Sequence, residues 1–425
     1  MNCISGSLLL ICLLAGTGCG VPASETASTK LSSSYSVHYA ITPNPNEESV
    51  TVEMSVRQTR GHLRELTFSF SGSRISAFEA DGELHVSDNS IRWLPGRDGG
   101  SLRWTARIPH KRRDSGFDAL LDGDWGIFRA EDIIPRARTR TLKGAGSETS
   151  LSFHLPVGWT AVSEYSTLAS QIDVVNPDRR FDQPRGWIAM GKLGIRRETI
   201  AGTRVAIAAP EGQNVRRMDM LALLNWVLPE LVAVLPDAIP RLTVVSAGDP
   251  MWRGGLSAPA SIFIHASRPL ISENATSTLA HELVHVAIGI AAESGFDWIV
   301  EGLAEYYSLE LLQRGGAITA RRYQRALEKQ SEWAASATTL CGPRSSGATT
   351  ALAVVTLRNL DQEIRQKSAG QFSLDSVLTQ LSAARSNITL GTIETIVSEL
   401  IQGPSETLAV DKLPGCNQNT SLPEA

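Results

Sequence analysis

The chain has 425 residues, of which 42% are hydrophobic, 20% charged and 6% aromatic, so it is long enough for two or three folded domains. This composition excludes a disordered or low-complexity protein. Forty basic and 44 acidic residues give a net charge of −4, and we therefore expect no nucleic acid among its partners. No run of 18 or more apolar residues follows the first twenty positions, which argues against a membrane span in the body of the chain.

The first 18 residues have the pattern of a secretory signal peptide. A short apolar stretch at 8–15 precedes the small residues at 16–18, and Cys19 follows them. This order resembles a bacterial lipobox, in which the leader is removed and the cysteine receives a lipid. Gly16 replaces the usual branched aliphatic residue and the leader has no Lys or Arg, so plain secretion and an uncleaved anchor stay open. The pattern favours an exported bacterial lipoprotein at the periplasm or cell surface, held to the membrane only through Cys19.

Two cysteines lie far downstream of the leader, at Cys341 and Cys416. An even pair in an oxidising compartment predicts one disulfide between them. Two independent thiols are the alternative.

The region 35–210 is predicted to be an N-terminal domain of antiparallel strands, similar to a β-sandwich. Residues 19–34 before it are small, polar and aperiodic, as in a flexible tether. The clearest strand is 49–56, where apolar residues alternate with polar ones and would share one face. The strands expected in this region lie at 35–41, 49–56, 66–70, 91–94, 102–108, 151–155 and 205–209.

Helical periodicity replaces alternation after residue 211. It begins at Val215 and ends near Pro236, and two strands at 241–247 and 260–265 follow. The remainder is mainly helical, so the chain as a whole is predicted to be an α+β protein of several domains. The later helices are expected at 276–292, 299–313, 318–335, 347–367, 373–384 and 390–402.

One helical segment contains the sequence His281-Glu282-x-x-His285. Two histidines four residues apart lie on one face of a helix, one turn from each other, as a single tetrahedral Zn²⁺ requires. Glu282, next to the first histidine, can reach a water held by the metal and act as a general base. For the pentapeptide alone, a structural pair of buried histidines is the alternative.

A third ligand is expected from Glu301, sixteen residues after His285 and in a second helical pattern. A carboxylate there completes a site of two histidines and one glutamate with a fourth position open, and we expect one zinc ion per chain. Glu305 lies one turn beyond Glu301. It either accepts a hydrogen bond from a ligand histidine or is an exposed helix charge, and the sequence leaves both open.

The stretch 301–316, Glu-Gly-Leu-Ala-Glu-Tyr-Tyr-Ser-Leu-Glu-Leu-Leu-Gln-Arg-Gly-Gly, resembles a helix of the glycyl aminopeptidase family of gluzincin zinc metallopeptidases. The helical segments 348–367 and 373–377 are similar to the C-terminal helices of that family. The segment 253–256, Arg-Gly-Gly-Leu, is similar to its Gly-Gly-Leu-Glu segment. The resemblance covers about 215–410, and the chain would be a divergent member.

The resemblance implies a thermolysin-like catalytic domain at 211–315, followed by a C-terminal helical domain at 316–425. It implies hydrolysis of peptide bonds by metal-activated water, as an aminopeptidase or an oligopeptidase, with peptides as substrates. It also implies that Gly254, Gly255 and Leu256 belong to the edge strand that holds the substrate. Exo- against endo-cleavage and the oligomeric state stay open.

Two positions depart from the family. The family continues Gly-Gly-Leu with a glutamate that helps to hold the amino terminus of the substrate, and Ser257 stands there instead. Roughly at the position where the family has a tyrosine that stabilises the oxyanion, this chain has Arg344. It is our first candidate for the donor to the oxyanion. Tyr323 and Tyr307 follow as candidates. The alternative for Arg344 is a solvated loop charge, and the alternative for Tyr307 is packing in the core. Together these departures leave open a weak or inactive peptidase fold that serves as a binding or scaffold lipoprotein.

Overall fold

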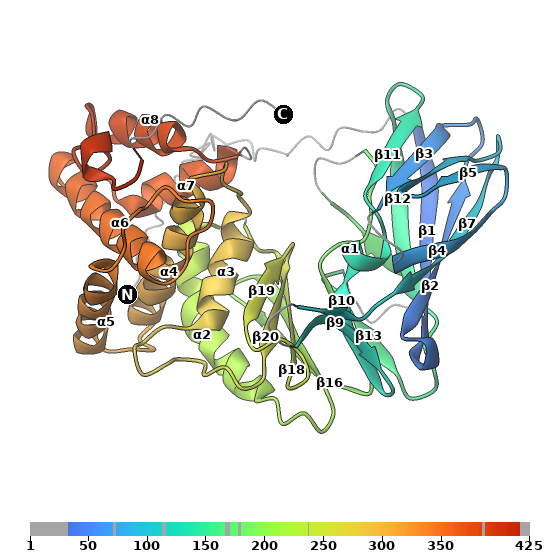
Figure 1. Cartoon of the computed structure of the whole chain (residues 1–425), viewed down its shortest axis with the longest axis horizontal. Coiled ribbons are helices and arrows are strands. Elements are labelled where there is room, and N and C mark those ends of the chain that lie inside the picture. Colours follow the sequence, from blue (N-terminus) through green and yellow to red (C-terminus); the bar gives the residue numbers. More distant parts are fainter. Residues whose placement is uncertain are drawn as a thin grey trace, which may run out of the picture.

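The computed structural model describes residues 33–70, 74–112, 116–165, 171–176, 180–236, 238–384 and 387–416. The predicted leader, Cys19 and the predicted tether up to residue 32 lie outside these residues. Among the described helices, none combines the length and the hydropathy that a membrane crossing requires. In Figure 1 the strands of the N-terminal half lie on the right and the later helices on the left.

The first sheet has the strand order β14-β12-β1-β2-β7-β4. The alternation predicted for 49–56 is confirmed, because all four apolar residues at alternate positions of β2 are buried. Most neighbours are antiparallel, but β1 and β12 pair in parallel. The bounds are β1 Ser33–Asn44, β2 Ser49–Arg57, β4 Ile75–Ala80, β7 Gly99–Arg107, β12 Ala145–Phe153 and β14 Ile172–Val174.

Two smaller sheets complete the N-terminal half. The order β11-β3-β6-β5 forms one of them, with bounds β3 Leu63–Ser69, β5 Glu83–Ser87, β6 Ser90–Leu94 and β11 Ala137–Thr141. The order β13-β15-β10-β9-β8 forms the other, with bounds β8 His110–Lys111, β9 Phe117–Asp122, β10 Trp125–Arg129, β13 Thr160–Val162 and β15 Trp187–Gly191. A short helix, α1 (Ala130–Ile133), follows β10.

The sheet that supports the later helices has the order β16-β17-β18-β20-β19. It includes the antiparallel hairpin β16–β17, which falls within the predicted N-terminal region 35–210, and β17 of this hairpin pairs in parallel with β18. An alternating pattern indicates which face of a strand is buried but not which strand it pairs with, so the sequence pattern does not reveal this pairing. The bounds are β16 Leu193–Ile200, β17 Thr203–Pro210, β18 Arg241–Ala247, β19 Gly255–Ala258 and β20 Ser261–His265.

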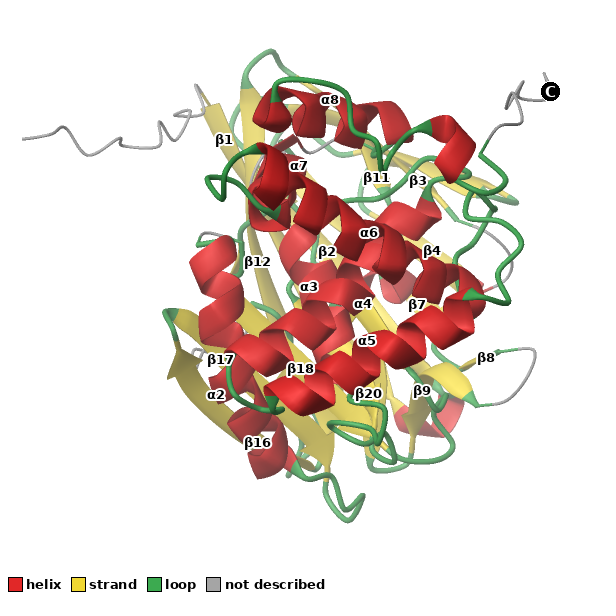
Figure 2. Cartoon of the chain, turned by 90° about the vertical axis from the view of Figure 1, so that its left-hand side faces the viewer, coloured by secondary structure: helices red, strands yellow, loops and turns green. Residues whose placement is uncertain are grey.

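The helices cover one face of this sheet, and Figure 2 looks onto this helical layer with strands behind it. Buried apolar side chains from the sheet and from α2 to α8 form one continuous core, so the regions 211–315 and 316–416 share their interior. The predicted helices are confirmed to within a few residues. The bounds are α2 Arg217–Val234, α3 Thr278–Ile288, α4 Asp297–Arg314, α5 Ala320–Ala334, α6 Ala348–Lys367, α7 Leu374–Ala384 and α8 Leu390–Ile401.

The opposite face of this sheet packs on the sheet of β8, β9, β10, β13 and β15. Val244 of β18 belongs to the core under the helices, whereas the next residue, Val245, belongs to the core between the two sheets. Trp187 of β15 lies in this second core, with its ring 5.4 Å from that of Phe263. Its indole N–H donates to the carbonyl of Leu256 in β19 at 3.0 Å. The N-terminal half therefore holds the edge strand in place.

Gly302 in α4 tests how closely α4 packs on α6. A Cβ at Gly302 would lie 2.7 Å from the Cβ of Ala353, so we expect Gly302→Ala to lower the free energy of unfolding by about 1–3 kcal/mol. Helix propensity alone would raise it by about 1 kcal/mol. Urea unfolding of this variant is compared with Gly403→Ala, whose new Cβ would meet nothing within 4 Å. An unchanged or increased stability of Gly302→Ala would contradict the packing.

Candidate metal centre

Helix α3 carries the two histidines of the motif, and both of its ends are capped. The hydroxyl of Ser277 accepts a hydrogen bond from the N–H of Ala280 at 3.2 Å. At the other end Gly289 adopts a left-handed conformation with φ 61°, and its N–H donates to the carbonyl of His285. The apolar side chains of the helix are buried in the common core, which directs His281 and His285 toward α4.

Three side chains from α3 and α4 converge as the motif predicts. The Nε2 atoms of His281 and His285 are 3.1 Å apart. Each is 3.4 Å from a different carboxylate oxygen of Glu301. Ligands about 2.0–2.1 Å from a tetrahedral zinc ion are about 3.3 Å from one another. The donor set and its spacing therefore fit zinc.

Glu305 lies beside His281. Its Oε2 is 3.0 Å from the Nδ1 of His281, and its Oε1 accepts a hydrogen bond from the side-chain amide of Gln330 at 3.2 Å. A carboxylate at Nδ1 holds the proton on that nitrogen and leaves the lone pair of Nε2 for a metal. Of the two roles that the sequence leaves open for Glu305, the geometry favours the histidine partner. Gln330 of α5 carries no motif and was not anticipated.

The charges around the ligand atoms favour a cation. Burial of His281 opposes its protonation, but the neighbouring carboxylates of Glu301 and Glu305 outweigh this effect and raise its pKa to about 10. Burial acts against ionisation of Glu301 as well, yet hydrogen bonds from both histidines lower its pKa to about 2. A positive charge is therefore stabilised at the point where the three side chains meet.

Two cavities open on either side of these ligands. The Arg268 cavity, about 420 Å³, is lined by Arg268, Trp252, Trp333 and Gly254 among others, and none of the first three was anticipated. The Ser257 cavity, about 450 Å³, is lined by Ser257 with Leu256 and Val300. Gly255, His281, Glu282 and Glu301 line both cavities.

Glu282 is largely buried and lies where the two cavities meet. The space beside it depends on Gly255, since a Cβ at that position would lie 2.5 Å from the Thr278 methyl and 3.0 Å from the Glu282 Cγ. Any larger residue at Gly255 would push against the predicted base. The segment predicted to hold the substrate thus lies directly against the predicted general base.

Strand β19 is the free edge of its sheet. The N–H of His265 donates to the carbonyl of Gly254 at 3.0 Å, which makes these two a hydrogen-bonded pair. In an antiparallel ladder the residues between such pairs direct their N–H and C=O groups away from the partner strand. Gly255 and Ser257 therefore present backbone donors and acceptors to the cavities.

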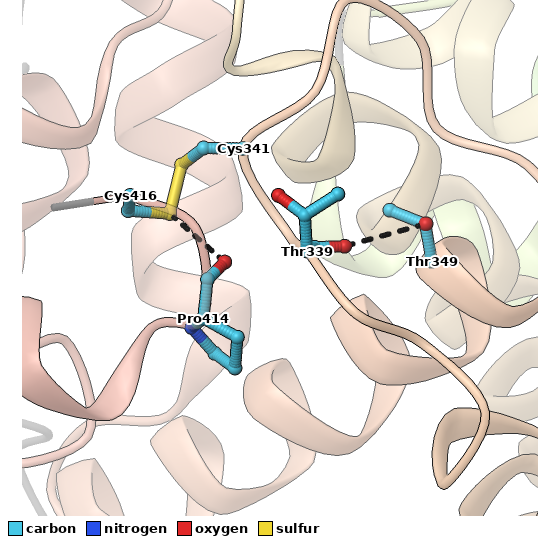
Figure 3. Close-up of a disulfide and its surroundings, with 5 residues drawn as sticks. All are labelled: Thr339, Cys341, Thr349, Pro414 and Cys416. Atoms are coloured by element: carbon cyan, nitrogen blue, oxygen red, sulfur yellow. Dashed lines mark hydrogen bonds between the residues drawn. A yellow bond between two sulfur atoms is a disulfide. The ribbon is translucent and has the colours of Figure 1, made fainter. Parts of the chain in front are cut away.

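Cys341 and Cys416 form the predicted disulfide, which Figure 3 shows beside the loop that leads to α6. The N–H of Ser345 in this loop donates to the carboxylate of Asp297 at 2.7 Å. Ser345, Ser346 and Gly347 line the Arg268 cavity. The side chain of Arg344 is exposed and is not among the lining residues, so its role as oxyanion donor stays a prediction.

The structure does not bring the two candidate tyrosines to the cavities. The hydroxyl of Tyr323 donates to Glu310, and burial followed by the charge of Glu310 raises the pKa of Tyr323. The hydroxyl of Tyr307 donates to Asp375 at 2.8 Å within the core. Both rings tie α4 to its neighbouring helices.

Replacing Glu305 tests the support of the first ligand. We expect Glu305→Gln to weaken zinc binding by about 10- to 100-fold, because the amide removes the charge that orients and polarises His281. Competition with a chromogenic chelator measures the affinity. Glu328→Gln, which removes an exposed charge from α5, is the matched control. Equal affinities in the two variants would contradict this role of Glu305.

Removing the disulfide tests its contribution to stability. The bond joins residues 75 positions apart, and a loop of that length predicts a loss of about 4 kcal/mol in the free energy of unfolding when both cysteines become serine. Urea unfolding of Cys341→Ser/Cys416→Ser measures it, and the unmodified protein with reductant should match the variant. If reductant does not change the urea concentration at the unfolding midpoint of the unmodified protein, the result would argue against the bond.

No protein-family model and no curated protein matches this chain. The aminopeptidase N family protein from Idiomarina loihiensis aligns with a TM-score of 0.62 at 16% identity, over 82% of this chain and 70% of its own. An M1 zinc metallopeptidase from Deinococcus radiodurans aligns with a TM-score of 0.56 at 16% identity, over 92% of this chain and 95% of its own. A variant of a two-domain M1 zinc metallopeptidase bound to L-arginine aligns with a TM-score of 0.56 at 15% identity, over 88% of this chain and 92% of its own. The chain therefore has a fold like that of M1 zinc metallopeptidases.

Proposed function

We propose that the protein is a zinc-dependent peptidase in which His281, His285 and Glu301 hold the metal. The observation that carries the proposal is the convergence of two imidazole nitrogens and one carboxylate at the spacing of zinc ligands. Glu282 and the free edge of β19 lie beside this point. The fold shared with M1 zinc metallopeptidases supports the same conclusion.

Zinc, when bound, supplies a Lewis acid that lowers the pKa of water and polarises a carbonyl group. The carboxylate of Glu282 takes a proton from the attacking water and later delivers it to the leaving amine. Glu305 keeps His281 in the tautomer that a metal needs. The intact set of ligands and base supports hydrolysis over the scaffold function.

The peptide substrate would add to β19 as a further strand. Gly255 and Ser257 offer their backbone N–H and C=O groups, and main-chain hydrogen bonds of this kind hold an extended peptide independently of its sequence. We keep Arg344 as the proposed donor to the developing oxyanion, because a guanidinium group can donate hydrogen bonds to negative charge.

We also propose that the protein acts outside the cytoplasm as a lipoprotein anchored through Cys19. The disulfide between Cys341 and Cys416 supports an oxidising compartment. The small residues before Cys19 support cleavage and lipid attachment at that position.

Glu282→Gln is the variant that tests the proposed base. The amide keeps the shape of the side chain but accepts no proton, so we expect kcat/KM toward peptides to fall by at least about 100-fold while zinc content stays at one ion per chain. Peptide digestion and metal analysis are the measurements. Glu293→Gln, an exposed change just before α4, should keep full activity. A Glu282→Gln protein with full activity would exclude this residue as the base.

A further inference from the structure

A third cavity continues the groove beyond Ser257. This Arg185 cavity, about 600 Å³, is lined by Arg185 and by the β19–β20 turn at Pro259. It shares Ser257, His285 and Ile290 with the Ser257 cavity. Free space therefore follows the edge strand on both sides of the metal ligands. An enzyme that removes single terminal residues needs a groove that is closed on one side.

Each carboxylate that lines these three cavities already has a partner among the described residues or a role proposed above. The carboxylate of Asp297 accepts the N–H of Ser345. Glu164 lies between two arginines, Arg185 and Arg241. The other acidic side chains that line the groove are the base, the ligand and the partner of His281 described above. An ammonium group at Ser257 would find a neutral hydroxyl.

The Arg185 cavity instead carries an excess positive charge. Arg241 is held by the buried Glu164 at 3.2 Å, by the carbonyl of Val175 at 3.1 Å and by the ring of Tyr165. Arg185 comes only to 3.7 Å of Glu164, its side chain is 28% exposed and lines the cavity, and its guanidinium group forms no hydrogen bond with the described residues. One carboxylate thus faces two guanidinium groups, and Arg185 keeps its hydrogen-bonding capacity for a ligand.

We propose that this groove takes internal segments of a peptide, with an acidic side chain on the amino side of the cleaved bond lying against Arg185. The inference rests on the proposed peptidase function and specifies its substrate. Acidic residues suit this place because a carboxylate and a guanidinium form charge-assisted, often bidentate hydrogen bonds. A blocked amino terminus does not hinder such a substrate.

Binding to the zinc-loaded Glu282→Gln protein tests the groove without turnover. The probes are fluorescent peptides of about ten residues with either Glu or Gln throughout the amino-terminal half, and each is made with a free and with an acetylated amino terminus. An extended strand rises about 3.3 Å per residue, so a peptide of this length can follow the whole groove. We expect the Glu peptide to bind at least tenfold more tightly, and acetylation to leave its affinity unchanged. Equal affinities of the Glu and Gln peptides would overturn the acidic preference, and weaker binding on acetylation would overturn the open groove.

Arg185→Gln in the same background should reduce the tenfold preference to less than twofold. Arg197→Gln is the matched control, because Arg197 of β16 does not line the Arg185 cavity, and its loss should leave the preference intact. If Arg185→Gln does not fold, exchanging Glu for Lys in the probe supplies the test with the protein unchanged. Tight binding of the Lys peptide would contradict the proposal.

Cleavage by the unaltered zinc-loaded protein gives the second measurement, with products identified by mass spectrometry. We expect internal cuts in acetylated peptides, whereas stepwise loss of residues from free amino termini alone would overturn the inference. Ser257→Glu should shift the preference at least tenfold toward free amino termini. If no peptide is cut but the Glu282→Gln protein still prefers the Glu probe, hydrolysis fails and the groove assignment stands.

Discussion

The packing of α3 against α4 is the constraint on which the candidate metal centre depends. The ligand atoms come from two helices, yet all lie within 4.8 Å of one another. Side chains such as Leu283 and Leu303, both buried in the common core, hold the helices at this separation. Gly302 allows α6 to approach from behind. The hydrophobic core therefore determines the coordination geometry, and the ligands themselves need to contribute little to it.

Sequence patterns predicted those features that depend on residues close together in the chain. Alternation located β2, and three- and four-residue spacing located the helices that carry His281 and Glu301. Features that depend on tertiary contacts were not predictable in this way. The pairing of β17 with β18, the approach of Gln330 to Glu305 and the position of Arg268 all join distant segments. No local pattern contains that information.

The loop between Cys341 and α6, at the rim of the Arg268 cavity, also combines a feature that the sequence predicts with one that depends on tertiary contacts. The cysteine pair was predictable from residue counts, but the direction of the Arg344 side chain depends on how the loop is tied down. The disulfide fixes one end of the loop and the Ser345–Asp297 hydrogen bond fixes the other. Asp297 begins the helix that carries Glu301. The C-terminal segment, the cavity rim and the ligand helix are thereby joined mechanically.

The hydrogen bond from Trp187 to Leu256 gives the N-terminal β region a part in the binding groove. The bonded carbonyl belongs to the same short strand whose outer edge would receive a peptide. A hinge rotation that separated the two halves would pull on this strand or break the bond. Separation of the two halves and loss of the β19 edge to which a peptide would pair would then occur together. A peptide bound to β19 would oppose that rotation.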